Sequence, residues 1–292
     1  MILAAAVVGI LGGIASSLLK ELTHYVANFL QNDLHWEYKY YLYFFFPLIG
    51  IFLTVFYIRI FIRRSKFHHG IPPILYNISH GSSRLDFHNI YSQVISSALT
   101  VGLGGSAGLE APAVASGAAI GSNIGRFFGL NYRETTLLLA CGAGAGISGA
   151  FNSPIAGMIF AIEVILPEFS IPAVIPLLIA SAVSSVVSQI IYKEPLFVLV
   201  TSGWTIQAFW YYLILGILIG VYSIYFSQLN SYIHRAFAKI KNQYNKVWIG
   251  GIILGVLLAL LPAFYGEGYI TIHKLLSGNY QFLLAKRFFS KS

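Results

Sequence analysis

Charged residues are scarce in this chain of 292 residues. Asp, Glu, Lys and Arg make up only 10% of it, against about 25% in ordinary soluble domains. Hydrophobic residues make up 57%, and the mean hydropathy is +0.73. Because so few charges cannot cover a water-facing surface, lipid must cover much of the molecule. The composition therefore excludes a soluble protein and a disordered chain, and it indicates a polytopic membrane protein.

Cysteine is almost absent. The single Cys141 excludes an intrachain disulfide framework and a metal site built from several cysteines. It lies among small apolar residues, so we expect an inert packing role. No cleavable signal peptide is expected, because the first apolar run starts at Met1 without a basic segment before it. The net charge of +8 does not indicate nucleic acid as a partner, because the basic residues cluster at the ends of apolar runs.

Long apolar runs are present towards both ends of the chain. A helix that crosses a membrane needs about 20 residues. The long runs are Ile2–Leu19, Tyr40–Ile62, Pro172–Tyr192, Phe209–Ile233 and Val247–Phe264. Basic clusters follow the second and fourth of these runs and are expected to be cytoplasmic, which places the N-terminus in the cytoplasm. We expect an integral, multi-pass protein of the cell inner membrane.

The middle of the chain, from Gly70 to Glu168, has a different pattern. Its apolar runs are shorter and are broken by Gly, Ser and Pro. They are Ile90–Leu103, Pro112–Phe128, Leu137–Ile147 and Pro154–Leu166. Broken helices at membrane depth are tolerated only where they are buried in protein or line a cavity. We therefore predict an all-α membrane fold with broken, re-entrant helices in its middle.

Glycines recur at helical spacing in this middle region. Small residues four positions apart lie on one helix face and let two backbones approach closely. The first set is Gly117, Gly121, Gly125 and Gly129, and the second is Gly142, Gly144, Gly146 and Gly149. We predict that both sets pack deep within the helix bundle.

A glycine-rich stretch leads into Gly108-Leu109-Glu110-Ala111-Pro112 and an apolar helix. Pro112 suits the first turn of a helix. The unpaired N–H groups and the dipole of such an N-terminus favour an anion. Glu110 in that turn is able to occupy the anion position and to leave it on protonation. Acids within membranes are rare and usually functional, so we favour this role over a plain stabilising acid.

A second place for an anion lies in His68-His69-Gly70-Ile71-Pro72. Pro72 is expected to open a short helix with His69 and Gly70 at its N-terminus. The two histidines do not indicate a metal, because neighbours on an extended chain point to opposite faces and no Cys or acid lies nearby. We expect no metal and no cofactor.

Two further features carry less weight. Gly104 to Gly108 fits the G-x-S-x-G pattern of serine hydrolases around Ser106, but that elbow needs a preceding strand and a base within reach. A membrane helix is expected there instead, so we do not predict an enzyme. Glu163 ends an apolar segment, and we expect it to cap backbone groups or hold structure near the inner face.

These residues resemble the CLC family of chloride channels and proton/chloride antiporters. Gly108–Pro112 is similar to the family's G-(K/R)-E-G-P signature, and His68–Pro72 is similar to its G-S-G-I-P signature. Further segments match later parts of the family in order: Ala150–Gly157, Phe160–Glu163, Phe209–Gly216 and Gly266–Tyr269.

The resemblance implies chloride transport by a homodimer in which each subunit has its own anion pathway. Each subunit has two inverted halves, so residues 1–200 are the first repeat and 201–292 the start of the second. Glu110 falls on the gating carboxylate, which competes with chloride and carries the proton. The residues that fall around the anion are His69, Gly70, Ile71, Gly108, Leu109 and Ala111.

The chain also departs from the family pattern. His69 replaces a serine, Leu109 a basic residue and Ala111 a glycine. Val164 falls where proton-coupled members usually carry an inner glutamate, which weakens the case for antiport. Tyr280–Phe289 resembles the start of another helix, and the later G-x-F-x-P segment is absent, so we expect a truncated product. The alternatives are a channel or antiporter for another anion, such as nitrate or fluoride, and a non-conducting fragment.

Overall fold

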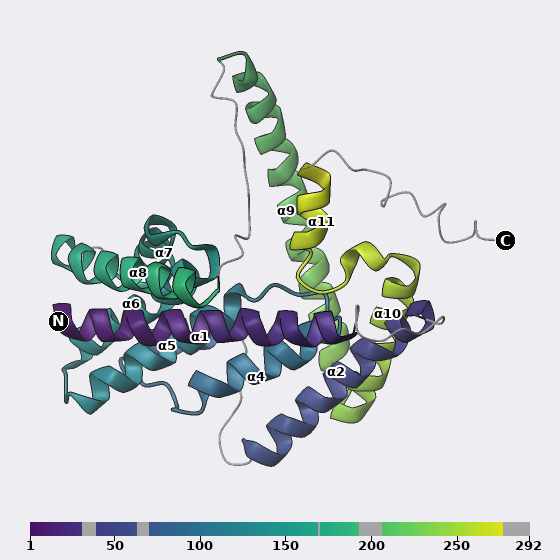
Figure 1. The fold of residues 1–292 in the computed structure, drawn as a ribbon, viewed down its shortest axis with the longest axis horizontal. Helices are drawn as coiled ribbons and strands as arrows, with labels where there is room; N and C mark the ends of the chain where they lie inside the picture. Colours follow the sequence, from purple (N-terminus) through teal and green to yellow (C-terminus); the bar gives the residue numbers. More distant parts are fainter. Residues whose placement is uncertain (31–38, 63–69, 169, 193–205, 277–292) are drawn as a thin grey trace.

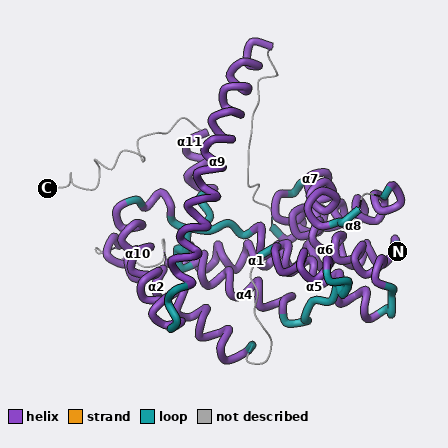
Figure 2. Tube along the Cα trace, turned by 180° about the vertical axis from the view of Figure 1, so that it is seen from behind, coloured by secondary structure: helices purple, strands orange, loops and turns teal. Residues whose placement is uncertain are grey.

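The structure is a computed structural model that describes residues 1–30, 39–62, 70–168, 170–192 and 206–276 (Figure 1). Within these ranges it is helical and contains no strand (Figure 2), which confirms the predicted all-α fold. Among the described residues, 4 helices are long and apolar enough to cross a membrane. They are Ile2–Asn28, Phe44–Phe61, Ile171–Ile191 and Phe209–Ala238.

The helices follow the apolar runs of the sequence closely. In chain order they are α1 (Ile2–Asn28), α2 (Lys39–Phe61), α3 (Pro72–Ser79), α4 (Asn89–Gly102), α5 (Glu110–Phe127), α6 (Tyr132–Phe151), α7 (Pro154–Phe160), α8 (Ile171–Ile191), α9 (Phe209–Ala238), α10 (Gln243–Leu260) and α11 (Tyr269–Leu276). A π-helical turn, Ala161–Ile165, continues α7, and a 3-10 turn, Pro262–Phe264, follows α10.

Helix α6 begins five residues before the apolar run predicted at Leu137. The reason is a capping box, in which the side chain of Asn131 accepts from the N–H of Glu134 and the Glu134 carboxylate accepts from the N–H of Asn131. Both contacts satisfy N–H groups that the helix leaves unpaired, so the polar residues before Leu137 belong to the helix.

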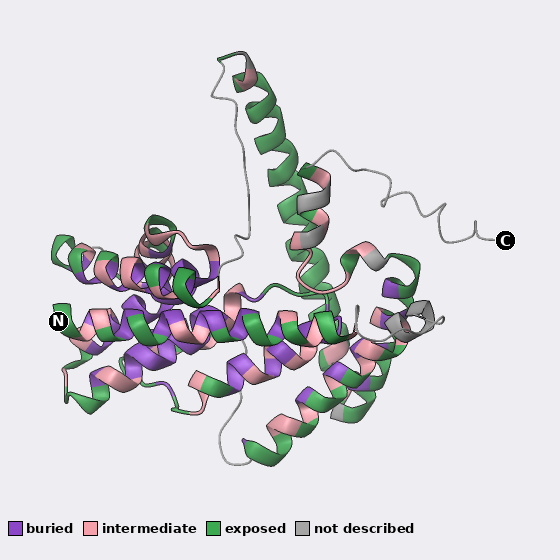
Figure 3. Ribbon diagram, viewed as in Figure 1, coloured by how far each residue is buried: buried purple, intermediate pink, exposed green. Residues whose placement is uncertain are grey.

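Helix α1 lies along the centre of the main bundle (Figure 1). It packs against α8, α6, α4 and α5, and α6 in turn packs against α5, α7 and α8. A smaller layer contains α2, which packs against α10 and α4. Helix α9 projects away from the bundle and has no buried residue (Figure 3). The main bundle therefore holds the core, and its centre is where the broken helices meet.

Close glycine packing joins α5 to α6, as predicted. A Cβ on Gly117 would overlap the carbonyl oxygen of Gly142, and a Cβ on Gly142 would overlap that of Gly117. Gly121 meets the backbone of Leu138 in the same way. Cys141 lies within this contact and is fully buried, as a packing residue should be.

Two expectations need correction. Gly129 does not share the packing face of α5, because the helix ends at Phe127 and Gly129 follows with a φ of +63°. A Cβ at Gly129 would have nothing within 4 Å. That left-handed conformation after a helix end is one that glycine adopts without strain. Glu163 is exposed on the π-helical turn and caps no helix within the described ranges, so its expected capping role is wrong, whereas its expected role in holding structure near the inner face stays a prediction.

Candidate functional site

The loop between α4 and α5 brings a helix N-terminus to the centre of the molecule. Gly104 has a φ of +101°, and a Cβ there would overlap the ring of Tyr265. The hydroxyl of Tyr265 donates a hydrogen bond to the carbonyl of Gly102 over 3.3 Å. Only glycine fits both the backbone conformation and this contact. The segment after α10 therefore closes over the glycine-rich loop.

Glu110 is the first residue of α5, and Pro112 lies in the same first turn, as predicted. The carboxylate folds back over the loop, since a Cβ on Gly108 would overlap its Oε2 atom. Its Oε1 atom accepts a hydrogen bond from the hydroxyl of Tyr269, the first residue of α11. Glu110 is half-buried. The carboxylate thus sits beside the unpaired N–H groups of the helix start, where an anion is favoured.

A small cavity of about 10 Å³ adjoins the Glu110 carboxylate. A space of this size holds about one water molecule. It is lined by Ser16, Leu19, Lys20, Leu109, Glu110, Ala113, Ala150, Phe151, Glu267 and Tyr269. Side chains from α1, α5, α6 and α11 meet there, so four segments far apart in the sequence form one site.

Lys20 is a charged residue that lines this cavity and that the sequence analysis did not identify. It lies in the long apolar helix α1 and is only 4% exposed. Its Nζ atom donates to the carbonyl of Gly149 over 3.2 Å and lies 5.3 Å from the ring centroid of Tyr192. Because Gly149 is in the last turn of α6, the ammonium also meets the negative end of that helix dipole. A lysine within a long apolar helix is the sequence signal that could have identified it.

Glu267 is a second carboxylate at the site and lies in the loop between α10 and α11. Its side chain is 10% exposed, and its Oε1 atom is 3.7 Å from Nε2 of His24. Burial, followed by the negative charge of Glu110, raises the pKa of Glu267 to about 7, and the charge of Lys20 opposes this rise. Glu267 therefore changes its charge in the neutral pH range, next to Glu110.

Of the other predicted site residues, some lie at the Glu110 cavity and others lie away from it. Leu109 is 4% exposed and lines the cavity, Ala111 is half-buried beside it, and Gly108 is exposed on the loop. Gly70 has a φ of +80° and, with Ile71, leads into α3, so Pro72 opens a short helix as predicted. Gly70 and Ile71 do not line the cavity around Glu110.

His68 and His69 lie outside the described residues, as does Tyr280–Phe289.

Ser106 does not occupy a nucleophile elbow. The segment before it is helix α4, and the described residues contain no strand from which such an elbow is built. Ser106 itself is exposed on the loop between two helices. The G-x-S-x-G pattern around Ser106 therefore does not adopt the strand–turn–helix geometry of a nucleophile elbow.

Comparison with known proteins decides the family. The family model described as "Voltage gated chloride channel" matches residues 50–290, which is more than half of the chain. The chain belongs to this CLC family. Its integral membrane character follows from that membership together with the long apolar helices.

The CLC relatives include transporters. The H(+)/Cl(−) exchange transporter ClcA of Vibrio parahaemolyticus is 31% identical over 183 residues, which are 59% of this chain and 39% of the relative. The putative chloride channel protein ClcB-like of Ralstonia nicotianae is 32% identical over 192 residues, 62% of this chain and 44% of the relative. The chain thus spans less than half the length of these curated relatives.

The helix arrangement matches solved CLC structures. A CLC-type fluoride/proton antiporter superposes with a TM-score of 0.82 at 26% sequence identity, over 97% of this chain and 72% of that one. This likeness confirms the predicted CLC-type architecture of broken helices.

Proposed function

We propose that this CLC chain moves chloride across a membrane, with Glu110 as the movable carboxylate that gates the anion and carries a proton. The position of Glu110 supports the proposal most directly. Its carboxylate lies over the loop at the start of α5, held by the Tyr269 hydroxyl, in the place that favours an anion. Protonation removes the negative charge and with it the competition for that place.

The remaining parts of the pathway follow from the same proposal. The anion is held by loop backbone and side chains at two helix starts, the α3 start with His69, Gly70 and Ile71, and the α5 start with Gly108, Leu109 and Ala111. No covalent chemistry is required, since oriented dipoles replace the hydration of the ion. The chain acts as a transporter rather than an enzyme, and we propose no cofactor or metal.

We further propose the assembly and the orientation of the chain. Residues 1–200 form the first repeat and 201–292 the start of the second, in a subunit that pairs as a homodimer. The basic residues that follow α2 support a cytoplasmic N-terminus, because basic segments stay inside. The inner membrane of the cell is the proposed location.

The experiment is anion flux from liposomes that contain the purified chain. Chloride release under a potassium gradient clamped by valinomycin is expected to exceed release from protein-free liposomes, with the internal pH recorded at the same time. Chloride release equal to the protein-free leak would contradict the proposal and leave the non-conducting fragment as the explanation.

Fluoride is the second candidate ion, favoured by the likeness to a CLC-type fluoride/proton antiporter. Flux measured with chloride, fluoride and nitrate in turn separates the candidates. Chloride is expected to be the fastest of the three, and preferential fluoride release would replace it as the transported ion.

Glu267 is expected to set the pH dependence of transport. Because its pKa is about 7, its charge opposes a negative Glu110 only above that pH, and Glu267→Gln removes this repulsion. The pH profiles of wild type and Glu267→Gln should coincide at low pH and separate above pH 7. There the half-point of the variant is expected to lie at lower pH than that of wild type, because the negative charge of Glu267 no longer repels that of Glu110.

The measurement is chloride flux against pH in the same liposomes. Glu21→Gln is the matched control, because Glu21 is exposed on α1 and its substitution removes an equal charge elsewhere. A Glu267→Gln profile that overlays the wild type above pH 7, or one that moves upward, shows that Glu267 does not act on Glu110.

A further inference from the structure

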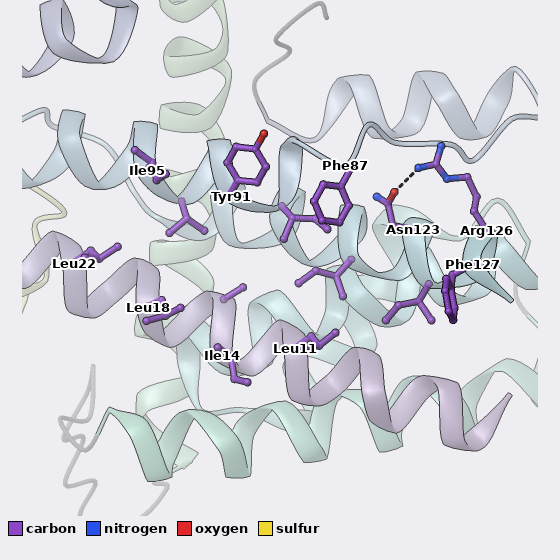
Figure 4. Close-up of a pocket in the computed structure, with 15 residues that line it drawn as sticks. Leu11, Ile14, Leu18, Leu22, Phe87, Tyr91, Ile95, Asn123, Arg126 and Phe127 are labelled. Carbon is purple, nitrogen blue, oxygen red and sulfur yellow. Dashed lines mark hydrogen bonds between the residues drawn. The ribbon is translucent and has the colours of Figure 1, made fainter. Parts of the chain in front are cut away.

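An apolar groove runs between α1, α4 and α5 (Figure 4). It shares no lining residue with the Glu110 cavity. Its volume is about 920 Å³, at the upper end of the range for ligand pockets. The lining residues are Leu11, Ile14, Ala15, Leu18, Leu22, Phe87, Ile90, Tyr91, Val94, Ile95, Ile120, Asn123, Ile124, Arg126 and Phe127. Aliphatic and aromatic side chains from three helices form its walls.

The groove has the length of one acyl chain in one leaflet. From Leu11 to Leu22 the wall follows α1 for about 16 Å at the helical rise, close to half of the ~30 Å hydrocarbon core. Leu11, Leu18 and Leu22 are each more than 40% exposed along this stretch. Because α1 is long and apolar enough to cross a membrane, an acyl chain is a chemically suited partner for these exposed side chains.

One end of the groove is polar and positively charged. Arg126 and Asn123 lie together there, far from Leu22 and Ile95 at the other end (Figure 4). The Arg126 guanidinium donates to the Asn123 side-chain oxygen. The Asn123 amide donates in turn to the carbonyls of Ala119, over 2.7 Å, and Leu85, over 3.2 Å. The guanidinium is therefore held at the groove end by an anchored partner.

A second cavity continues beyond Arg126. It has a volume of about 730 Å³ and is lined by Gly81, Ser82, Arg84, Arg126, Gly129, Leu130, Tyr132 and Thr135. Two arginines thus face one space, while the three lining hydroxyls, those of Ser82, Tyr132 and Thr135, already donate to the carbonyls of Asn77, Ile78 and Leu130. Such a lining suits an anion with several oxygen acceptors, since guanidinium groups bind phosphate through paired hydrogen bonds.

The backbone on both sides of Arg84 is anchored. Ser83 and Leu85 are buried, and the Ser122 hydroxyl joins them by donating to the carbonyl of Ser83 over 2.7 Å and accepting from the N–H of Leu85 over 2.9 Å. Arg84 itself is exposed. Its side chain therefore projects outward from a fixed backbone.

The acids near this positive end have other partners. The Glu134 carboxylate accepts from the N–H of Asn131 in the capping box of α6, and Oδ2 of Asp86 lies 3.6 Å from Nε2 of His88. No acidic residue is among the described residues that line either cavity. The positive charge of Arg84 and Arg126 is thus available to a ligand.

We propose that the groove between α1, α4 and α5 binds one anionic glycerophospholipid, with an acyl chain along the groove and the phosphate between Arg84 and Arg126. The apolar walls bury the chain, and the two arginines select an anionic head group over a zwitterionic one. This site does not depend on Glu110 or on the proposed transport activity.

The test is lipid binding by native mass spectrometry of the purified chain in detergent, with phosphatidylglycerol and phosphatidylcholine as probes. Wild type is expected to retain phosphatidylglycerol in preference. Arg126→Gln is expected to weaken its retention about tenfold, the effect of losing one charged hydrogen-bond partner. Leu18→Trp is expected to weaken it similarly by filling the groove. Arg235→Gln, an equal charge change on exposed α9, is the control and should retain wild-type binding.

Three outcomes overturn the proposal. Equal retention of the two lipids shows that the arginines do not select the head group. Displacement of phosphatidylglycerol by millimolar inorganic phosphate shows that the acyl chain contributes nothing. Unchanged binding in Arg126→Gln or in Leu18→Trp places the lipid elsewhere on the protein.

Discussion

Glu110→Gln is expected to abolish proton movement while anion flux continues. Glutamine keeps the shape of the side chain beside Gly108 and Tyr269, but it cannot release or take up a proton near neutral pH. Without a charge it also no longer competes with the anion at the start of α5. The measurement is simultaneous recording of chloride and pH changes in liposomes, where proton movement should fall to the protein-free leak.

Glu163→Gln is the matched control for this experiment. Glu163 is an exposed acid on the π-helical turn after α7, so the control removes the same charge away from the cavity. It is expected to keep both fluxes at wild-type values. If Glu110→Gln retains the wild-type proton flux and its pH dependence, the proposed role of this carboxylate is wrong.

Gly142→Leu is expected to prevent correct folding. Its Cβ would overlap the carbonyl oxygen of Gly117, a backbone atom that cannot move without separating α5 from α6. Overpacking in a core typically costs about 1–3 kcal/mol and occasionally more, and a backbone clash belongs at the upper end of that range. Since α5 carries Glu110 and α6 ends at the cavity, the site is lost together with the contact.

Thermal unfolding in detergent, followed by size-exclusion chromatography, measures this effect. Gly216→Leu is the control, because Gly216 lies on α9 and a Cβ at that position would have nothing within 4 Å. The Gly142→Leu protein is expected to aggregate or to unfold at a much lower temperature, and the Gly216→Leu protein to behave as wild type. Equal unfolding temperatures for the two variants would show that the α5–α6 approach is not required.

Much of the fold and part of the site could be predicted from the sequence. The lengths of the hydrophobic runs and their Gly and Pro interruptions predicted where the helices lie. A helix that crosses the bilayer needs about 20 apolar residues, and its backbone N–H and C=O groups must be hydrogen-bonded within the protein. The Gly-rich lead and Pro112 placed Glu110 in a first turn, since both are local preferences of the backbone. Glycine spacing also predicted that both glycine sets pack closely, because small residues four positions apart share a helix face. The pairing of Gly117 with Gly142 came from the structure.

The tertiary structure alone decided which distant residues join Glu110. Lys20, Glu267 and Tyr269 come from separate segments, and nothing in local periodicity shows that they line the same cavity. Their proximity depends on how α1 and the segment after α10 pack over the start of α5. The sequence determined that a buried helix N-terminus with an acid exists. The packing determined which donor and which charges surround that acid, because charge interactions depend on distance in space rather than along the chain.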